Sequence, residues 1–258
     1  MEAIWQAFPV FLLVMIRILA FLYFIPIFSY RNFPSVFRTG LSAYLAAIVT
    51  FTLGKQPIDL DGLFILLALK EVLVGASLGI IGYIMMTAMQ VAGGFIDFQM
   101  GFAIANVIDP FTGAQSPVMG QYLYLFAILF LLATDGHHLL IDGIVHSFQF
   151  IPPSGRIAAF GEEKTMLIVS RVFATMFLSG VQIAIPIVGS LFLVDVALAI
   201  VSRTVPQMNI FVVGIPAKIL ISFLLFLIIL GPMVAAVGNL FEILLYALRD
   251  WMALLGQG

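Results

Sequence analysis

The stretch DFQMGFAIANVIDPFTGAQSP occupies residues 97–117 and lies between two strongly apolar parts of the chain. It contains Asp109-Pro110 and Ser116-Pro117, and a proline disfavours helical angles in the residue before it. Thr112-Gly113 between the two pairs is typical of a turn. Interrupted backbone at membrane depth is tolerated where protein buries it or where it lines a water-filled space. We therefore predict a loop at or inside a passage, positioned by the rest of the chain.

The composition around this stretch is that of an integral membrane protein. Of the 258 residues, 63% are hydrophobic and 9% are charged, and the mean hydropathy is +1.19. Soluble domains average about 25% charged residues. The net charge of −2 without a basic patch excludes nucleic acid as a partner. The absence of cysteine excludes disulfides and thiol chemistry.

Six apolar runs predict an all-α membrane protein with broken helices. The last two runs would each exceed 50 Å as unbroken helices, at about 1.5 Å per residue, which is more than a bilayer of ~30 Å requires. They are separated by the polar segment 202–209, which predicts a long C-terminal helical hairpin, and the best candidate linker before it is 156–164. The runs cover residues 8–28, 40–53, 63–91, 118–133, 165–202 and 211–255.

Charged residues inside these runs need partners. Arg17 lies in the middle of the first run, where a charge usually faces the bundle interior. Lys70 and Glu71 lie about 100° apart around a helix, so we expect each to find another partner. An ion-coupled carrier with discontinuous helices is the alternative function for these charges, although structural ion pairs explain them more simply. The charges concerned are Arg17, Lys70, Glu71, Asp97 and Asp195.

Small residues on the third run predict a close helix contact. Gly75 and Gly79 form a GxxxG spacing, which lets another helix approach closely.

Four polar residues after the fourth run have spacings of 3, 4 and 4: Asp135, His138, Asp142 and His146. They share one helical face, and histidine and carboxylate bind zinc and other divalent metals. A straight helix spreads the four over about 16 Å, whereas zinc ligands converge within about 2.3 Å of one ion. Neighbouring pairs fit an ion better than all four do, and a polar face against a partner subunit, water or lipid headgroups is the simpler interpretation.

Signatures of catalysis are missing from the sequence. It has no cysteine, no GxSxG motif, no HExxH motif and neither common phosphate-binding glycine motif. We predict no enzyme activity, no cofactor and no metal site.

Motifs along nearly the whole chain resemble the FliR/SpaR/EscT family of type III export apparatus membrane proteins. The most specific are DPxTG in the opening stretch, GHH in DGHHLLIDG at 135–143, and SRxxPQxNxFxxGxPxK between 202 and 218. The early pattern RILAFLYFIPIFSYRNFPSVFRTG at 17–40 is also similar. All occur in the order found in the family.

The resemblance implies a subunit of the flagellar protein export gate in the basal body at the bacterial inner membrane. Its implied partners are FliP-like and FliQ-like membrane subunits, an FlhB-like subunit, the lipid membrane and the unfolded proteins that are exported. It also implies two parts, a FliP-like part at 1–160 and a FliQ-like hairpin at 161–258.

Two groups of residues acquire expected roles through the resemblance. The first would form a pore plug and comprises Asn106, Ile108, Asp109, Pro110, Phe111, Gly113, Pro117 and Met119. The second would contact other subunits and comprises Arg17, Gly75, Gly79, His137, His138, Arg203, Pro206, Gln207, Asn209 and Lys218.

Overall fold

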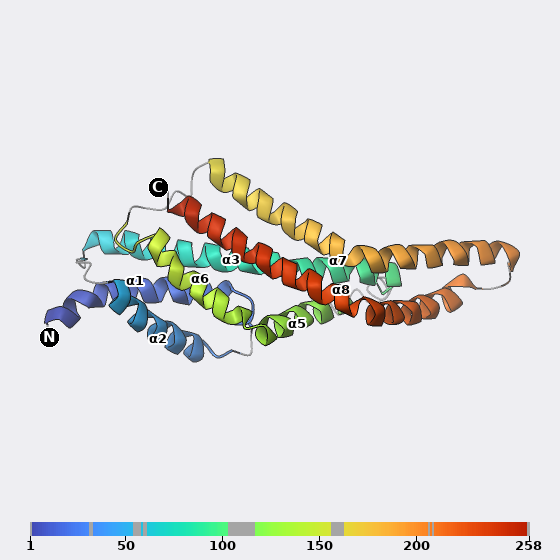
Figure 1. The fold of residues 1–258 in the computed structure, drawn as a ribbon, viewed down its shortest axis with the longest axis horizontal. Coiled ribbons are helices and arrows are strands. Elements are labelled where there is room, and N and C mark those ends of the chain that lie inside the picture. The colour runs from blue at the N-terminus through green and yellow to red at the C-terminus, as the bar shows by residue number, and fades with distance from the viewer. Residues whose placement is uncertain are drawn as a thin grey trace. The chain divides into compact units, whose positions relative to one another are not determined.

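The computed structural model describes residues 2–30, 33–53, 58, 61–102, 117–155, 163–205, 207 and 209–256. Every regular element in this part of the chain is a helix, which confirms the predicted all-α class (Figure 1). The helices are α1 (Glu2–Phe24), α2 (Ser35–Leu53), α3 (Gly62–Met100), α5 (Val118–Ala133), α6 (Gly136–Phe150), α7 (Glu163–Thr204) and α8 (Ile210–Leu255).

Five of the described helices are long and apolar enough to cross a membrane, and the count rises to six if α5 and α6, bent at their short break, form one span. The helices α7 and α8 contain 42 and 46 residues, corresponding to about 63 and 69 Å. Pro186 and Pro216 lie inside them without ending either helix. The long C-terminal hairpin expected from the sequence is therefore present.

Some helix boundaries differ from the apolar runs. Helix α1 ends at Phe24, and Ile27 just beyond Pro26 has a φ of 78°. Helix α2 begins at Ser35, directly after Pro34 and five residues before the apolar run at 40–53. Helix α3 continues through Gly93 to Met100, because tertiary contacts hold the segment that glycine alone would loosen.

The chain divides into two compact units. Unit 1 comprises Met1–Met85, Leu131–Phe173 and Phe241–Gly258, and unit 2 comprises Met86–Phe130 and Ala174–Leu240. The predicted FliP-like and FliQ-like parts concern likeness to other proteins and stay a prediction.

Unit 1 buries a cluster of charges. Arg17, Lys70 and Glu71 are between 0% and 2% exposed. Arg17 forms a two-pronged ion pair with Glu71, in which Nη2 donates to Oε1 at 3.0 Å and Nε donates to Oε2. Lys70 Nζ lies 3.2 Å from Glu71 Oε1, so the expectation that these neighbours would not pair was wrong. The flexible lysine side chain makes up for the 100° between their positions.

The remaining donors of this cluster reach the end of α6. Arg17 Nη1 donates to Ser147 Oγ at 3.1 Å, and Nη2 donates to the Ile151 carbonyl at 2.7 Å. Lys70 Nζ donates to the carbonyls of Pro152 and Pro153, both at 2.9 Å. The cluster therefore ties α1, α3 and the segment after α6 together, and each buried charge has the partners that burial demands.

The glycine face of α3 packs on α1 within unit 1. A Cβ atom at Gly75 would collide with the Arg17 carbonyl oxygen, and one at Gly79 would lie 2.8 Å from the Phe21 carbonyl oxygen. The close helix contact predicted from GxxxG thus lies inside the chain, and the subunit contact that the resemblance implies for Gly75 and Gly79 stays a prediction. Arg17 is likewise enclosed by its own chain.

Candidate functional site

Asp97 in unit 2 links α3 and α5, the helices that precede and follow the segment 103–116. Asp97 lies near the C-terminus of α3 and is 5% exposed. Its carboxylate accepts hydrogen bonds from the backbone N–H of Met119, at 3.2 Å to Oδ1 and 3.0 Å to Oδ2. Met119 is the second residue of α5, where N–H groups lack partners within the helix and the dipole favours a negative charge. Asp97 therefore caps α5 from another helix.

Glycines bring the backbones of α3 and α5 together below the same segment. A Cβ atom at Gly93 would overlap the backbone of Gly120. A Cβ atom at Gly120 would lie 3.1 Å from the Gln90 carbonyl oxygen. Such close approach is possible only with glycine on both sides. The helices α3 and α5, which precede and follow the predicted loop, are therefore held close together, while residues 103–116 of the loop lie outside the described chain.

A second polar network ties the end of α3 to the hairpin. Gln99 Nε2 donates to Asp195 Oδ2 at 2.8 Å, and Asp195 forms an ion pair with Lys218. Lys218 Nζ also donates to the Gln99 carbonyl oxygen at 3.3 Å. Asp195 and Lys218 belong to α7 and α8. Sequence analysis noted both charges but did not pair them, since 23 positions of helix and turn separate them and nothing local encodes their contact.

The predicted plug residues are only partly within the described chain. Pro117 lies beside Gly94 and Gly120, and Met119 is 6% exposed. Both therefore belong to the base of the loop. The others, Asn106, Ile108, Asp109, Pro110, Phe111 and Gly113, lie outside the described residues.

At the hairpin tip, the described polar residues are exposed. Arg203 lies in the last turn of α7, where a positive charge is favourable next to the helix dipole. Gln207 and Asn209 are exposed, and the Asn209 carbonyl accepts from the N–H groups of Val212 and Val213. Pro206 lies outside the described residues. Lys218 is not at the tip but in the network with Asp195.

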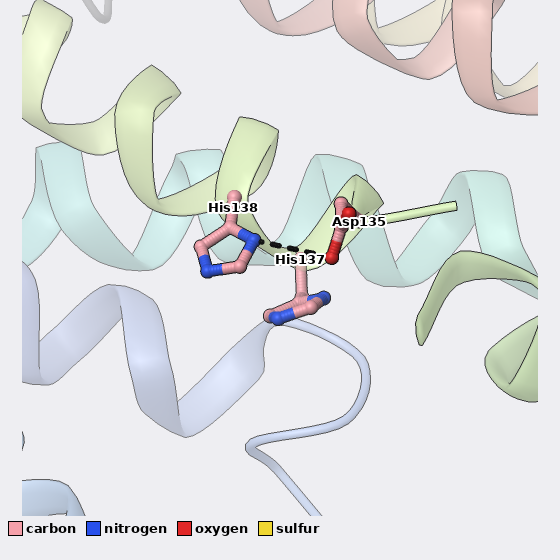
Figure 2. Close-up of side chains that lie close together, drawn as sticks. All are labelled: Asp135, His137 and His138. Carbon is pink, nitrogen blue, oxygen red and sulfur yellow. Dashed lines mark ion pairs between the residues drawn. The ribbon is translucent and has the colours of Figure 1, made fainter. Parts of the chain in front are cut away.

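The four-residue polar face of α6 separates into two pairs. His138 Nδ1 lies 3.5 Å from Asp135 Oδ1, and His146 Nδ1 lies 3.5 Å from Asp142 Oδ1. His137, absent from the predicted set of four, joins the first pair, and the potential ligand atoms of Asp135, His137 and His138 lie within 4.8 Å of one another (Figure 2). Helical spacing missed His137 because Asp135 precedes the helix with left-handed backbone angles, φ 55° and ψ 18°.

Comparison with known proteins identifies the family. The chain matches the bacterial export proteins, family 1, over residues 8–244. It is 49% identical to the flagellar biosynthetic protein FliR of Bacillus subtilis (strain 168) over 257 residues, which cover 99% of both chains. It is 28% identical to the flagellar biosynthetic protein FliR of Escherichia coli (strain K12) over 222 residues, covering 86% of this chain and 84% of that one.

A protein of a different system is also similar. The Yop proteins translocation protein T of Yersinia pestis is 27% identical over 215 residues, which cover 82% of each chain. These matches confirm the resemblance drawn from the motifs, and with it a non-enzymatic membrane component of a type III export apparatus. Since the family match spans residues 8–244 and the Bacillus relative aligns along nearly the full length, the chain belongs to the bacterial export proteins of family 1, the family of the flagellar FliR proteins.

Proposed function

We propose that this chain is a structural and gating subunit of the flagellar type III export gate, through which unfolded flagellar subunits cross the bacterial inner membrane. The loop 106–117 acts as the plug of the passage. The observation that carries this proposal is the clamp between the Asp97 carboxylate and the Met119 N–H, which joins the two helices that precede and follow the loop.

A clamped base suits a plug for a mechanical reason. The helices on either side stay in place through the Gly93–Gly120 contact and the network of Gln99, Asp195 and Lys218. The proposed plug, the loop 106–117, lies in the chain between these helices. Its Ile108 and Phe111 supply apolar side chains, which seal a narrow passage by excluding water.

The exposed apolar surface of the hairpin supports assembly with other membrane subunits. Large apolar side chains are exposed from Met166 to Val201 on α7 and from Val212 to Tyr246 on α8. Helices of about 63 and 69 Å are roughly twice as long as the ~30 Å hydrocarbon layer. Lipid covers only part of this surface, and an apolar surface outside lipid requires protein. FliP-like, FliQ-like and FlhB-like subunits are the partners we assign to it.

The polar tip of the hairpin supplies hydrogen-bonding and charged groups for contact with other subunits. Arg203, Pro206, Gln207 and Asn209 form it, and the exposed His138 with neighbouring His137 offers a further polar contact. In this proposal residues 1–160 take the FliP-like place in the assembly and residues 161–258 the FliQ-like place.

The buried charges do not favour the alternative of an ion-coupled carrier. Arg17, Lys70 and Glu71 are enclosed and bonded to one another and to main-chain carbonyls. Asp195 is likewise paired with Lys218. Structural pairing therefore accounts for these residues.

Replacing Asp97 with alanine tests the clamp. We expect the gate to assemble at near-normal yield but to leak ions, since the N-terminus of α5 loses its cap, a change that costs about 0.5–2 kcal/mol. The measurement is the decay of the membrane potential in cells that express the gate without substrate. Asp61→Ala is the matched control, because Asp61 accepts a bond of 3.0 Å from the Leu63 N–H at the exposed start of α3. Equal decay in the two variants would contradict the clamp.

Replacing Arg203 with alanine tests the hairpin tip. The variant chain should recover less of the small membrane partners when purified in mild detergent, because the exposed guanidinium is lost. Native mass measurement of the purified complex gives the copies retained. Arg249→Ala, which removes another exposed arginine on α8, serves as the control. Recovery at the wild-type level would rule out the tip as a contact, and a wild-type chain found only as a monomer or homodimer would rule out the gate.

A further inference from the structure

Three potential metal ligands converge in unit 1 at the break between α5 and α6. One ligand atom from each of Asp135, His137 and His138 lies within 4.8 Å of the other two. His138 Nδ1 and Asp135 Oδ1 are 3.5 Å apart, and the two imidazole rings have centroids 4.1 Å apart. Figure 2 shows the Asp135 carboxylate directed toward the His138 ring, with the His137 ring lying beside both. The three residues therefore need only small rotations to face one ion.

The Asp135 carboxylate does not make the capping hydrogen bond that is usual at its position. Asp135 occupies the N-cap of α6, where an aspartate ordinarily accepts a hydrogen bond from the backbone N–H two or three residues later. Here its side chain makes no capping bond, and the His138 N–H is bonded to the Asp135 carbonyl at 2.9 Å. The side chain is 80% exposed, so its oxygens are accessible to an ion from solution.

His137 adds an independent observation. Its Nδ1 atom is buried, and within the described part of the chain it has no hydrogen-bond partner. A buried polar atom without a partner costs about 1–3 kcal/mol, and such atoms call for a missing ligand or ion. An imidazole nitrogen without a proton is a good ligand for divalent transition metals.

We propose that Asp135, His137 and His138 bind a divalent transition metal ion, with Zn²⁺ as the ion to be tested first. Two imidazole nitrogens and one carboxylate oxygen form a ligand set that zinc accepts, leaving the fourth position for water or another group. Ligands at about 2.05 Å from a tetrahedral ion lie about 3.3 Å from one another. The existing distance of 3.5 Å between His138 and Asp135 is close to that requirement.

The bound ion would hold the break in place. It joins Asp135, which has left-handed backbone angles, to two residues in the first turn of α6. The site therefore acts as a structural staple at the start of this helix, separate from the proposed plug and its clamp.

The second Asp–His pair provides a built-in control. His146 and Asp142 have the same separation of 3.5 Å and similar exposure, but the described residues supply no third ligand beside them. If any exposed Asp–His pair sufficed for binding, both pairs would contribute equally. The proposal requires the first pair to bind and the second to be silent.

The test uses the purified full chain in mild detergent, with an affinity tag that contains no histidine. Zn²⁺ is titrated in competition with a chromogenic chelator, and Co²⁺ replaces it to report the ligand geometry by absorption. We expect one ion per chain, and a loss of affinity of at least about tenfold for Asp135→Asn, His137→Gln and His138→Gln, since even partners outside the ligand set change affinity by 10–100-fold. His146→Gln should bind within twofold of the wild type.

Helix content and elution volume verify that each variant is folded. Asp135→Asn replaces one carboxylate oxygen with an amide nitrogen, so the side chain keeps its shape and the variant should fold like the wild type. The proposal is overturned if the wild-type chain binds no more tightly than Asp135→Asn. It is equally overturned if His146→Gln loses as much affinity as His138→Gln, since binding would then be a property of exposed histidines in general.

Discussion

Replacing Glu71 with alanine is expected to destabilise unit 1 by about 3–5 kcal/mol, the range for removing one partner of a buried ion pair. Glu71 is the carboxylate between the Arg17 guanidinium and the Lys70 ammonium, and all three side chains are buried. Its removal leaves two positive charges in a water-poor interior without a counter-charge. Hydrogen bonds to Ser147 and to main-chain carbonyls remain, but they are neutral partners.

The loss is a large fraction of the roughly 5–15 kcal/mol that stabilises a typical folded chain. Thermal unfolding in detergent, together with the amount of chain that accumulates in membranes, measures it. Glu242→Ala, at an exposed position of α8, should be close to neutral. The double variant Arg17→Leu with Glu71→Leu should recover part of the stability lost in Glu71→Ala, since it leaves one buried positive charge without a counter-charge, that of Lys70, instead of two. Unfolding of Glu71→Ala at the temperature of the Glu242 control would contradict a structural role for the cluster.

Deleting Val107–Gln115 is expected to give the largest functional effect, a gate that assembles but no longer holds back ions. Most of the segment above the Asp97–Met119 clamp is lost, including Ile108 and Phe111, while the clamp and its glycine contact remain. The contacts between α3 and α5 remain, so the free energy of unfolding of the chain should change little. The passage loses the side chains proposed to exclude water from it.

Dissipation of the membrane potential, measured with a voltage-sensitive dye, reports the leak, and co-purification of the partner subunits reports assembly. Shortening the predicted linker, 156–164, is the control for removing chain between helices. An intact membrane seal in an assembled gate would refute the plug, whereas a loss of assembly in the deletion alone would assign the segment to subunit contact instead.

Local patterns identified much of the molecule before any tertiary structure. Hydropathy and length predicted the helical membrane class and the apolar run that forms α5, Val118–Ala133. The rule that an intramembrane charge has a partner correctly predicted that Arg17 would be bonded. The same local rules failed at Lys70 and Glu71, because a helical wheel places Cα positions and ignores the reach of a four-carbon side chain.

Sequence by itself determined the fold class, the approximate helices and, through its motifs, the family. These properties depend on solvent preference and backbone angles, which each short segment carries within itself. The loop that it predicts at 97–117 lies largely outside the described residues and stays a prediction. Tertiary structure alone decided that Asp97 caps α5, that Asp195 meets Lys218 and Gln99, and that His137 joins Asp135 and His138. The first two depend on how helices distant in sequence pack against one another, and the third depends on the left-handed backbone angles of Asp135. The periodicity of a single segment predicts neither.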